Sequence, residues 1–233
     1  MNICVISMEN RIGTFLYKIG HMNHLKYCES NGYTYCEVND FSKYGKRCAG
    51  QYYKFCVIHD VMMRNSDVDW YMWVDMDAFF TNFGKKIEDC IPDDEKTQIC
   101  IAKDCDGGRW KLYDEGWNNG VFLMRNTELV RNFCNECGSD WIYELVNVLM
   151  SQRLSGCWDQ ACMTLLNKIG AYKDILQLIP AKSINCKWNT HYQGNGWKKG
   201  DFILHFAGMK NFFREQHLDE IGYNLETGEV GVK

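Results

Sequence analysis

The sequence has few of the features that mark linkers, disorder or nucleic-acid contacts. Among its 233 residues are only two prolines, with no stretch rich in proline, glycine or serine and no internal repeat. Hydrophobic residues make up 46% of the chain, enough to bury the core of one domain or of one domain with two lobes. The net charge of −4 comes without a long basic run, which excludes a nucleic-acid or anionic-membrane surface and favours small-molecule partners.

Signals for secretion and membrane insertion are also lacking. The first residues include neither a basic stretch nor a long apolar segment, no span approaches the length of a membrane helix, and no Asn-x-Ser/Thr acceptor occurs. The thirteen cysteines are an odd, scattered set, mostly within apolar segments, as reduced core thiols are. Cys134 and Cys137 form the one C-x-x-C pair, and a zinc site would need a second pair. These features predict a soluble protein of the reducing cytoplasm, without a membrane span.

The apolar pattern predicts alternating strands and helices. The expected strands are residues 2–8, 34–38, 70–76, 98–103, 118–124 and 202–206. The expected helices are residues 14–30, 51–64, 128–152 and 158–169. This alternation is typical of an open α/β sheet, in which ligands gather beyond the carboxyl ends of the strands. Ser7 and Asp75 both fall at such ends.

Two carboxylates one residue apart, Asp75 and Asp77, follow the apolar run Trp70–Val74. Because side chains alternate along a strand, both carboxylates would point to one side, with Val74 and Met76 in the core. Two like charges this close repel each other, and a divalent cation resolves the repulsion by binding oxygen from both. Asp-x-Asp is also common by chance, so this motif alone leaves both interpretations open.

His205 lies near the end of a later apolar run and is followed by Gly208 and Lys210. A histidine in such a run is usually a satisfied core residue. The glycine, however, permits close approach of the backbone, and the lysine suits a phosphate. Two carboxylates, one imidazole and open positions for phosphate oxygens would suit Mn²⁺ or Mg²⁺, provided that the fold brings them together.

Five segments in order along most of the chain form a longer pattern. They are Tyr52-Tyr53-Lys54, the run Asp69–Ala78, the run Asn118–Asn126, Trp158-Asp159-Gln160 and His205-Phe206-Ala207-Gly208-Met209-Lys210. This pattern resembles glycosyltransferase family 34, the galactosyl- and xylosyltransferases, with the retaining enzymes of family 8 as near relatives. The chain departs from the family at Met209, where cysteine is usual, and at Asn211, where a proline often follows the lysine.

The resemblance implies a GT-A fold, an α/β, Rossmann-like fold that binds nucleotide sugars on a mostly parallel central sheet. It implies one domain over residues 1–233, with a nucleotide-binding lobe of about 1–105, an acceptor-binding lobe of about 106–218 and a polar C-terminal tail. Eukaryotic members of the family typically carry an N-terminal membrane anchor, whereas this sequence opens on its first expected strand. We therefore expect a soluble enzyme of viral or bacterial type, acting in the host cytoplasm if viral.

The resemblance also assigns roles to residues around a nucleotide sugar. Asp75, Asp77 and His205 would hold Mn²⁺ or Mg²⁺ on the diphosphate, and Lys210 would neutralise phosphate charge during catalysis. The residues expected to bind the nucleotide sugar are Ser7, Met8, Lys54, Val74, Met76, Asp104, Asn118 and Gly208. Of these, Ser7, Met8 and Val74 would line the nucleoside pocket.

Asp159 and Gln160 would act as catalytic residues near the transferred sugar, one orienting its hydroxyls and the other facing the anomeric carbon. Asp159 could also cap the start of a helix, and Asn118 could close a turn before its strand. Four tryptophans in polar or glycine-rich stretches suit either stacking on sugars or packing: Trp110, Trp117, Trp188 and Trp197.

The sequence therefore predicts a metal-dependent transfer of a sugar from a UDP-linked donor to a glycan or another hydroxyl acceptor. Retention of anomeric configuration is expected from the resemblance and because no carboxylate stands out as the base that inversion needs. A haloacid-dehalogenase-like phosphatase is one alternative, although its Asp-x-Asp normally follows the first strand and has Thr or Val where Phe79 stands. A nucleotide-sugar-binding protein without catalysis is the other.

Overall fold

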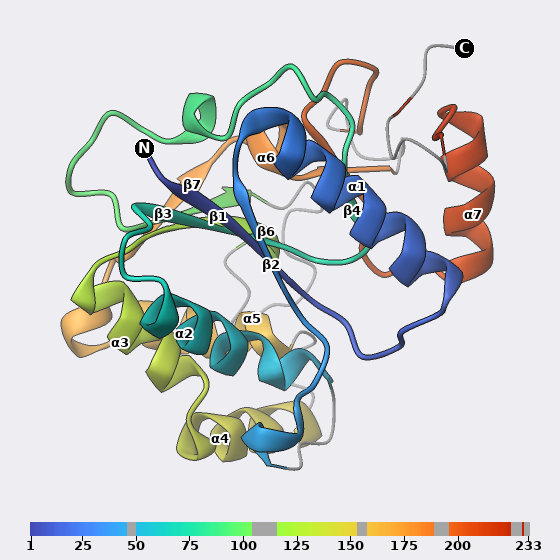
Figure 1. Ribbon diagram of the computed structural model, residues 1–233. Helices are drawn as coiled ribbons and strands as arrows, with labels where there is room; N and C mark the ends of the chain where they lie inside the picture. The colour runs from blue at the N-terminus through green and yellow to red at the C-terminus, as the bar shows by residue number, and fades with distance from the viewer. Residues whose placement is uncertain (46–49, 104–115, 153–157, 189–195, 225–229, 231–233) are drawn as a thin grey trace.

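A six-stranded sheet runs through the molecule (Figure 1), and its strand order is β2-β1-β3-β6-β5-β7. The computed structural model describes residues 1–45, 50–103, 116–152, 158–188, 196–224 and 230. The strands of this sheet are β1 (Ile3–Met8), β2 (Thr34–Val38), β3 (Trp70–Val74), β5 (Ile99–Lys103), β6 (Trp117–Arg125) and β7 (Leu176–Ile179). β1 pairs in parallel with β2 and β3, and β5 with β7, whereas β6 is antiparallel to β3 and β5. The expected α/β fold with a mostly parallel sheet is confirmed.

Helices cover both faces of the sheet (Figure 1). One face carries α2 (Lys54–Arg64), α3 (Glu128–Cys137), α4 (Asp140–Ser151) and α5 (Trp158–Asn167), and the other carries α1 (Phe15–Asn31) and α6 (Ala181–Ile184). Short 3₁₀ helices are η1 (Ser42–Tyr44), η2 (Gly50–Tyr53), η3 (Glu88–Cys90) and η4 (Gly170–Tyr172). In β3, Tyr71 and Trp73 pack toward α2, while Met72 and Val74 pack toward α1. A strand covered on both faces is apolar throughout, which explains the unbroken run that ends at Val74.

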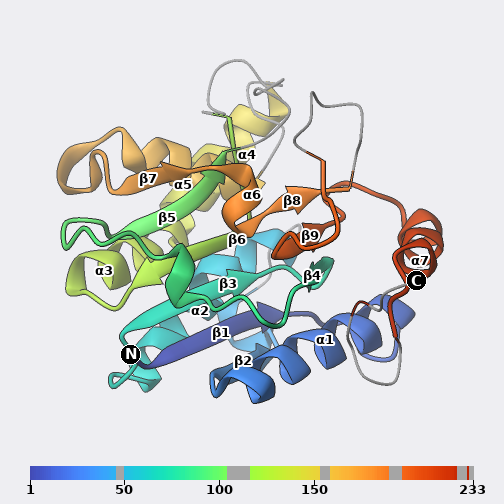
Figure 2. The ribbon, with the colours of Figure 1, turned by 90° about the horizontal axis from the view of Figure 1, so that it is seen from above.

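A smaller, three-stranded sheet in the order β4-β9-β8 lies beyond the carboxyl end of β3 (Figure 2). Its strands are β4 (Ala78–Phe80), β8 (Cys186–Lys187) and β9 (Ile203–His205), and α7 (Asn211–Glu220) follows β9. A third apolar cluster joins this sheet to α1 and α7 through Ile19, Phe79, Leu204 and Leu218. Pairing of β4 with β9 places His205 directly opposite Ala78. The small sheet therefore brings the histidine to the end of the Asp-x-Asp segment.

The expected long helix over 128–152 is wrong, because the structure has two helices there, α3 and α4. They separate at Gly138 and Ser139, where Ser139 precedes the first residue of α4. Gly138 packs closely on α2: its carbonyl oxygen lies 3.4 Å from Cys56 Sγ, and an added Cβ would lie 3.0 Å from that sulfur. The apolar pattern continues through both helices and so gave no sign of the break.

Other expected boundaries need smaller corrections. The strand expected over 70–76 ends at Val74, because the chain turns at Asp75. The helix expected over 51–64 begins as η2 and becomes regular only in α2. The short strands β4, β7 and β8 were not expected.

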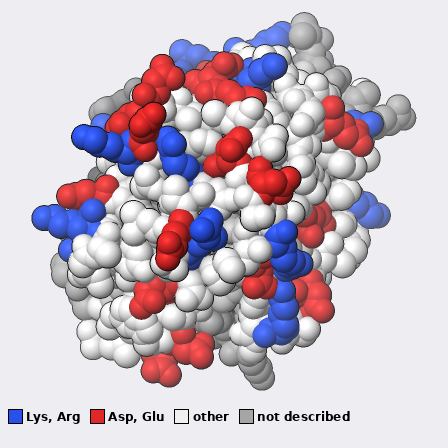
Figure 3. All heavy atoms as spheres, turned by 60° about the vertical axis from the view of Figure 1, so that its left-hand side comes forward, with Lys and Arg blue, Asp and Glu red and all other residues white. Residues whose placement is uncertain are grey.

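The helices, the surface charges and the C-x-x-C pair can now be placed on the structure. Within the described residues, none of the helices combines the length and the apolar character needed to cross a membrane. On the face shown in Figure 3, acidic and basic side chains are interspersed rather than gathered by sign. Cys134 and Cys137, the C-x-x-C pair, are both free and buried in the apolar core. Both cysteines therefore pack as core residues.

Candidate active site

The chain leaves β3 at Val74 and turns through Asp75, Met76 and Asp77 before β4 begins. Two backbone hydrogen bonds fix this turn: Asp75 N donates to Gly120 O at 2.7 Å, and Ala78 N donates to Asp75 O at 2.9 Å. The three turn residues line an open cavity of about 650 Å³. Met76 is buried, as expected, and also forms part of the cavity wall.

Buried polar side chains from β1 and α1 hold this turn from beneath. Ser7 Oγ donates to Val74 O at 2.8 Å and lies 3.0 Å from His24 Nδ1. His24 Nε2 donates to Ala78 O at 2.6 Å. Ser7 and His24 are both fully buried. The side chain of Ser7, expected in the nucleoside pocket, therefore supports the turn and does not line the cavity.

Helix α1 can approach the turn closely because it carries Gly20. A Cβ at this position would lie 2.4 Å from Met76 O, closer than real atoms come. Burial lowers the pKa of His24 to about 4, so its imidazole is neutral beside the turn near neutral pH. The clamp on the turn is thus made of uncharged hydrogen bonds and one close helix contact.

A chain of amides sets the orientation of His205. Asn185 Nδ2 donates to Asn118 Oδ1 at 2.9 Å, which leaves Asn185 Oδ1 to accept from His205 Nδ1 at 2.9 Å. With the hydrogen on Nδ1, a neutral His205 turns the lone pair of Nε2 toward Asp77 Oδ1, 3.4 Å away. A lone pair facing a carboxylate oxygen needs a proton or a cation between them.

The glycine of the Asn118–Asn126 segment makes room for this imidazole. A Cβ at Gly120 would lie 2.0 Å from His205 Cε1 and 2.7 Å from Nε2. The ring therefore packs directly on the bare backbone of β6, where any larger residue would displace it.

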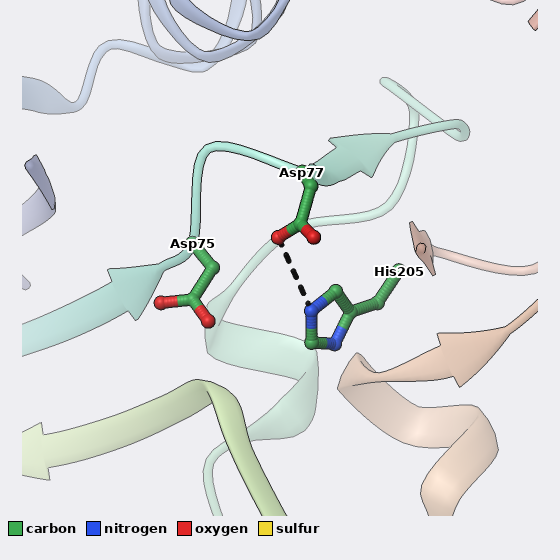
Figure 4. Close-up of side chains that lie close together, drawn as sticks. All are labelled: Asp75, Asp77 and His205. Atoms are coloured by element: carbon green, nitrogen blue, oxygen red, sulfur yellow. Dashed lines mark ion pairs between the residues drawn. The ribbon is translucent and has the colours of Figure 1, made fainter. Parts of the chain in front are cut away.

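Asp75, Asp77 and His205 form a group whose ligand atoms all lie within 4.8 Å of one another (Figure 4). The side chain of Asp75 is 31% exposed, that of Asp77 16% and that of His205 3%. The group thus opens toward the cavity at Asp75 and is closed behind His205. Two carboxylate oxygens and an imidazole nitrogen fit Mn²⁺ or Mg²⁺, with the remaining positions open to a ligand.

The two aspartates have opposite pKa shifts. Burial raises the pKa of Asp75, and the opposing effect of Lys54 does not overcome it. Burial would also raise the pKa of Asp77, but the contacts with His205 and Arg214 lower it well below its usual range. Asp77 is consequently the firmly anionic member of the group.

Lys54 links α5, β6 and the turn after β3 at the cavity wall. Its Nζ lies 2.5 Å from Asp159 Oδ2 on α5 and 3.1 Å from Asp75 Oδ1, and it donates to Asn119 O at 3.0 Å. Burial alone would lower the pKa of Lys54, but Asp159 and Asp75 together raise it, so the lysine stays charged. Next to Asp159, Gln160 Nε2 donates to the backbone oxygen of Trp117 at 2.5 Å.

Most of the predicted site residues come together around the cavity. Those that line it are Met8, Lys54, Asp75, Met76, Asp77, Asn118, Asp159, Gln160, His205 and Gly208. Val74 is fully buried and does not line it, which corrects its expected place in the nucleoside pocket. Lys210 is exposed just before α7 and is also absent from the lining, while Asp104 lies outside the described residues.

Three of the four tryptophans that suited either stacking on sugars or packing lie among the described residues, and none of the three lines the cavity. Trp117 is buried in the core, and Trp188 and Trp197 stack on each other with ring centroids 6.1 Å apart. Trp110 lies outside the described residues.

Several cavity residues escaped the sequence analysis. Arg214 of α7 reaches Asp77, and Arg11 lies beside Glu9 in the loop after β1. Asn185 orients His205 from behind the cavity. None of these four residues belongs to a recognisable motif, so local sequence carried no signal for them.

Comparison with known sequences supports the resemblance to family 34. Residues 7–115 match the galactosyl transferase GMA12/MNN10 family. An α-1,2-galactosyltransferase of Schizosaccharomyces pombe is 24% identical over 82% of this chain and 56% of its own length. An uncharacterized α-1,2-galactosyltransferase of the same yeast is 22% identical over 80% of this chain and 54% of its own length. The chain thus spans about half the length of these curated relatives.

Solved structures agree on the fold. A glycosyltransferase involved in the glycosylation of the major capsid of PBCV-1 superposes with a TM-score of 0.69 at 14% identity, over 95% of this chain and 100% of that one. The chain has the GT-A fold and resembles glycosyltransferase family 34. The galactosyltransferase LgtC, solved with donor and acceptor sugar analogs, matches this GT-A fold with a TM-score of 0.53 at 13% identity, over 89% and 87% of the two chains.

Proposed function

We propose that this GT-A glycosyltransferase moves a sugar from a UDP-linked donor to a hydroxyl of a glycan, with a divalent cation and with retention of configuration. The group of Asp75, Asp77 and His205 at the wall of an open cavity is the observation that carries this proposal. In glycosyl transfer, negative charge develops on the departing diphosphate. A divalent cation held by these three residues would stabilise that charge as it forms.

Residues beside this group supply the other parts of a donor site. Gly208 and Met8 both line the cavity, and the glycine allows the backbone to approach a ligand closely. Lys210 stands two residues beyond Gly208, where its flexible side chain can reach a phosphate at the cavity mouth. We assign the nucleoside to the wall at Met8 and the phosphates to the space between Asp75 and Gly208.

Asp159 and Gln160 are proposed to contact the transferred sugar. Asp159 contacts Lys54 through Oδ2, and its carboxyl oxygens can accept hydrogen bonds from sugar hydroxyls. Gln160 offers its amide oxygen to the cavity, because its nitrogen is already bound to Trp117 O. These two residues would orient the sugar and face its anomeric carbon, as the family resemblance implies.

The ion pairs of the cavity support retention. Inversion needs a carboxylate that is free to take a proton from the acceptor hydroxyl. Each carboxylate lining the described part of the cavity has a cationic partner: Glu9 has Arg11, Asp75 and Asp159 share Lys54, and Asp77 has Arg214. Retention would let the departing phosphate accept that proton on the same face of the sugar.

Galactose is the first candidate for the donor sugar, since both curated relatives are named as α-1,2-galactosyltransferases. The acceptor is proposed to be a glycan hydroxyl at the open side of the cavity, beyond Asp159. The GT-A fold gives no support to the phosphatase alternative. A binding protein without catalysis differs from an enzyme only in turnover, so the test must include transfer.

Calorimetry and product analysis test the proposal together. UDP and a panel of UDP-sugars, UDP-galactose first, are titrated into the protein with Mn²⁺ and then with EDTA. We expect binding that depends on Mn²⁺, because without a cation the aspartates repel the diphosphate. NMR of the first product formed from an α-linked donor should show an α-linkage. Equal UDP binding in EDTA would contradict the metal role, and a β-linked product would contradict retention.

A further inference from the structure

Arg214 is the one cation of α7 that reaches the candidate metal group, which consists of Asp75, Asp77 and His205. Its side chain is only 13% exposed, although most of α7 lies at the surface. One of its nitrogens, Nη2, lies 2.6 Å from Asp77 Oδ2, across 137 residues of sequence. A nearly buried arginine at a carboxylate is a strong directional contact, because both groups are charged and the guanidinium is planar.

The guanidinium is itself held in place on two sides. Nη1 donates to Asn211 Oδ1 at 2.9 Å, one turn back along α7, and Nη2 also lies 3.4 Å from Phe206 O. Asn211 stands where the family often has a proline. Its side-chain oxygen accepts a hydrogen bond from Arg214, which a proline side chain could not do. The sequence departure and the arginine thus form one unit.

Phe206 closes this arrangement into a ring of contacts. Its backbone nitrogen donates to Asp77 O at 3.0 Å, while its backbone oxygen accepts from Arg214. Phe206 also directly follows His205, the third member of the metal group. The ring therefore links the turn after β3, the end of β9 and α7 at a single point.

The two oxygens of Asp77 have separate partners. Oδ2 accepts from Arg214, whereas Oδ1 faces His205 Nε2 at 3.4 Å. With Oδ2 bound, the carboxylate cannot rotate freely, and Oδ1 stays turned toward His205 and Asp75 (Figure 4). The Nε atom of Arg214 is buried without a hydrogen-bond partner among the described residues. Arg214 thus holds its contact with Asp77 while one of its own donors stays without a partner.

We propose that Arg214 is a positioning residue that fixes the carboxylate of Asp77, so that its free oxygen faces the cation site shared with Asp75 and His205. This inference rests on the proposed function, because it assumes that the group binds a divalent cation. Arg214 acts on the cation through Asp77, and it makes assembly of the site depend on the docking of α7.

The direction in which Mn²⁺ affinity changes when Arg214 is removed distinguishes this positioning role from a purely electrostatic one. If Arg214 acted only as a nearby positive charge, its removal would strengthen binding of a divalent cation. If it orients Asp77, its removal should weaken binding, and loss of such an orienting partner typically lowers metal affinity about 10- to 100-fold. The experiment measures Mn²⁺ affinity without nucleotide, from the electron paramagnetic resonance signal of the free ion, for wild type and Arg214→Gln.

Two variants serve as controls. Arg11→Gln removes the same charge from the same cavity, but Arg11 is bonded to Glu9, so its Mn²⁺ affinity should change less than about threefold. Arg214→Lys keeps the charge but loses the planar fork, and we expect a loss of roughly fivefold, smaller than that of Arg214→Gln. Thermal unfolding of each variant reports whether the fold is intact.

Weaker Mn²⁺ binding by a folded Arg214→Gln, with Arg11→Gln close to wild type, supports the inference. Unchanged or tighter binding by Arg214→Gln overturns it. If Arg214→Gln does not fold, Asn211→Ala replaces it: this change removes only the support of the guanidinium, and a loss of affinity supports the inference while none overturns it. A wild-type protein that binds no Mn²⁺ contradicts the proposed function instead, so the two failures are distinct.

Discussion

The two walls of the candidate active site are held by different kinds of contact. The inner wall is the turn Asp75–Asp77 with β1 and α1 beneath it, and fully buried hydrogen bonds from Ser7 and His24 fix it. The outer wall is the segment 206–214, which is tied to the inner wall through Asp77. Within the outer wall, Gly208 and Lys210 are exposed.

We expect this difference in contacts to give the two walls different roles. Side chains that are buried with every partner in place hold their positions within the cooperative core of a protein. Segments with few buried contacts open more easily, and ligand-binding elements are often drawn from them. We expect the inner wall to set the positions of the metal ligands, and the outer wall to adjust when the donor enters. His205 lies where the two walls meet.

Gly120→Ala should have the largest effect on the free energy of unfolding, because it acts at that junction. The new Cβ would overlap the ring of His205, and overpacking of this kind costs roughly 3 kcal/mol at the upper end of its range. Displacement of the ring should also lower Mn²⁺ affinity at least about tenfold, as loss of correct ligand geometry does. Urea unfolding and Mn²⁺ titration measure the two effects.

Gly208→Ala is the matched control in the outer wall. Gly208 has φ of +70°, but an added Cβ there would meet nothing within 4 Å. The cost is the backbone strain alone, about 1 kcal/mol, and Mn²⁺ affinity should stay unchanged. Equal losses of Mn²⁺ affinity in the two variants would remove the distinction between the walls.

A pH series tests the buried clamp of the inner wall. The pKa of His24 is lowered by burial from 6.5 to about 4, so the unfolded chain binds its proton more readily than the folded one. Stability from this group is therefore present at neutral pH and is lost as pH falls below 6.5. Linkage predicts that the free energy of unfolding drops by about 2 kcal/mol more between pH 7.5 and pH 5 in wild type than in His24→Gln.

The glutamine variant keeps a side-chain nitrogen that can donate to Ala78 O, so it isolates the titration from the loss of a hydrogen bond. Urea unfolding at the two pH values gives both slopes. If wild type and His24→Gln lose the same free energy on acidification, the clamp does not depend on a neutral histidine.

The inner wall was predictable in part because its chemistry is local in sequence. Asp75 and Asp77 lie in one short segment after an apolar strand, and the site is built on both. The position of the Ser7 side chain was not predicted correctly from the local sequence. Ser7 shares a strand face with Ile3 and Val5, which pack toward α1, so its hydroxyl had to point beneath the turn and not into the cavity.

The outer wall was less predictable, because its contacts join segments far apart in sequence. The apolar run, the glycine and the lysine marked His205 and Gly208 as candidates, but only the family pattern placed them beside Asp75 and Asp77. Arg214 lies in a polar helix that resembles any solvated surface helix, and Asn185 lies in no motif. Their roles follow from the pairing of β9 with β4 and β8, which no periodicity of the sequence encodes.

Lys210→Ala should have the smallest effect on stability and still a large one on catalysis. The side chain is exposed, so its loss should change the free energy of unfolding by less than about 0.5 kcal/mol. If Lys210 moves onto the diphosphate as charge develops there, kcat should fall roughly 10²-fold, as loss of one positioned electrostatic contact does. Lys199→Ala, another exposed lysine outside the cavity, is the control and should leave kcat unchanged. An unchanged kcat in Lys210→Ala would place that lysine outside the reaction, whereas a loss of stability above 1 kcal/mol would show that the outer wall is more tightly held than its exposure implies.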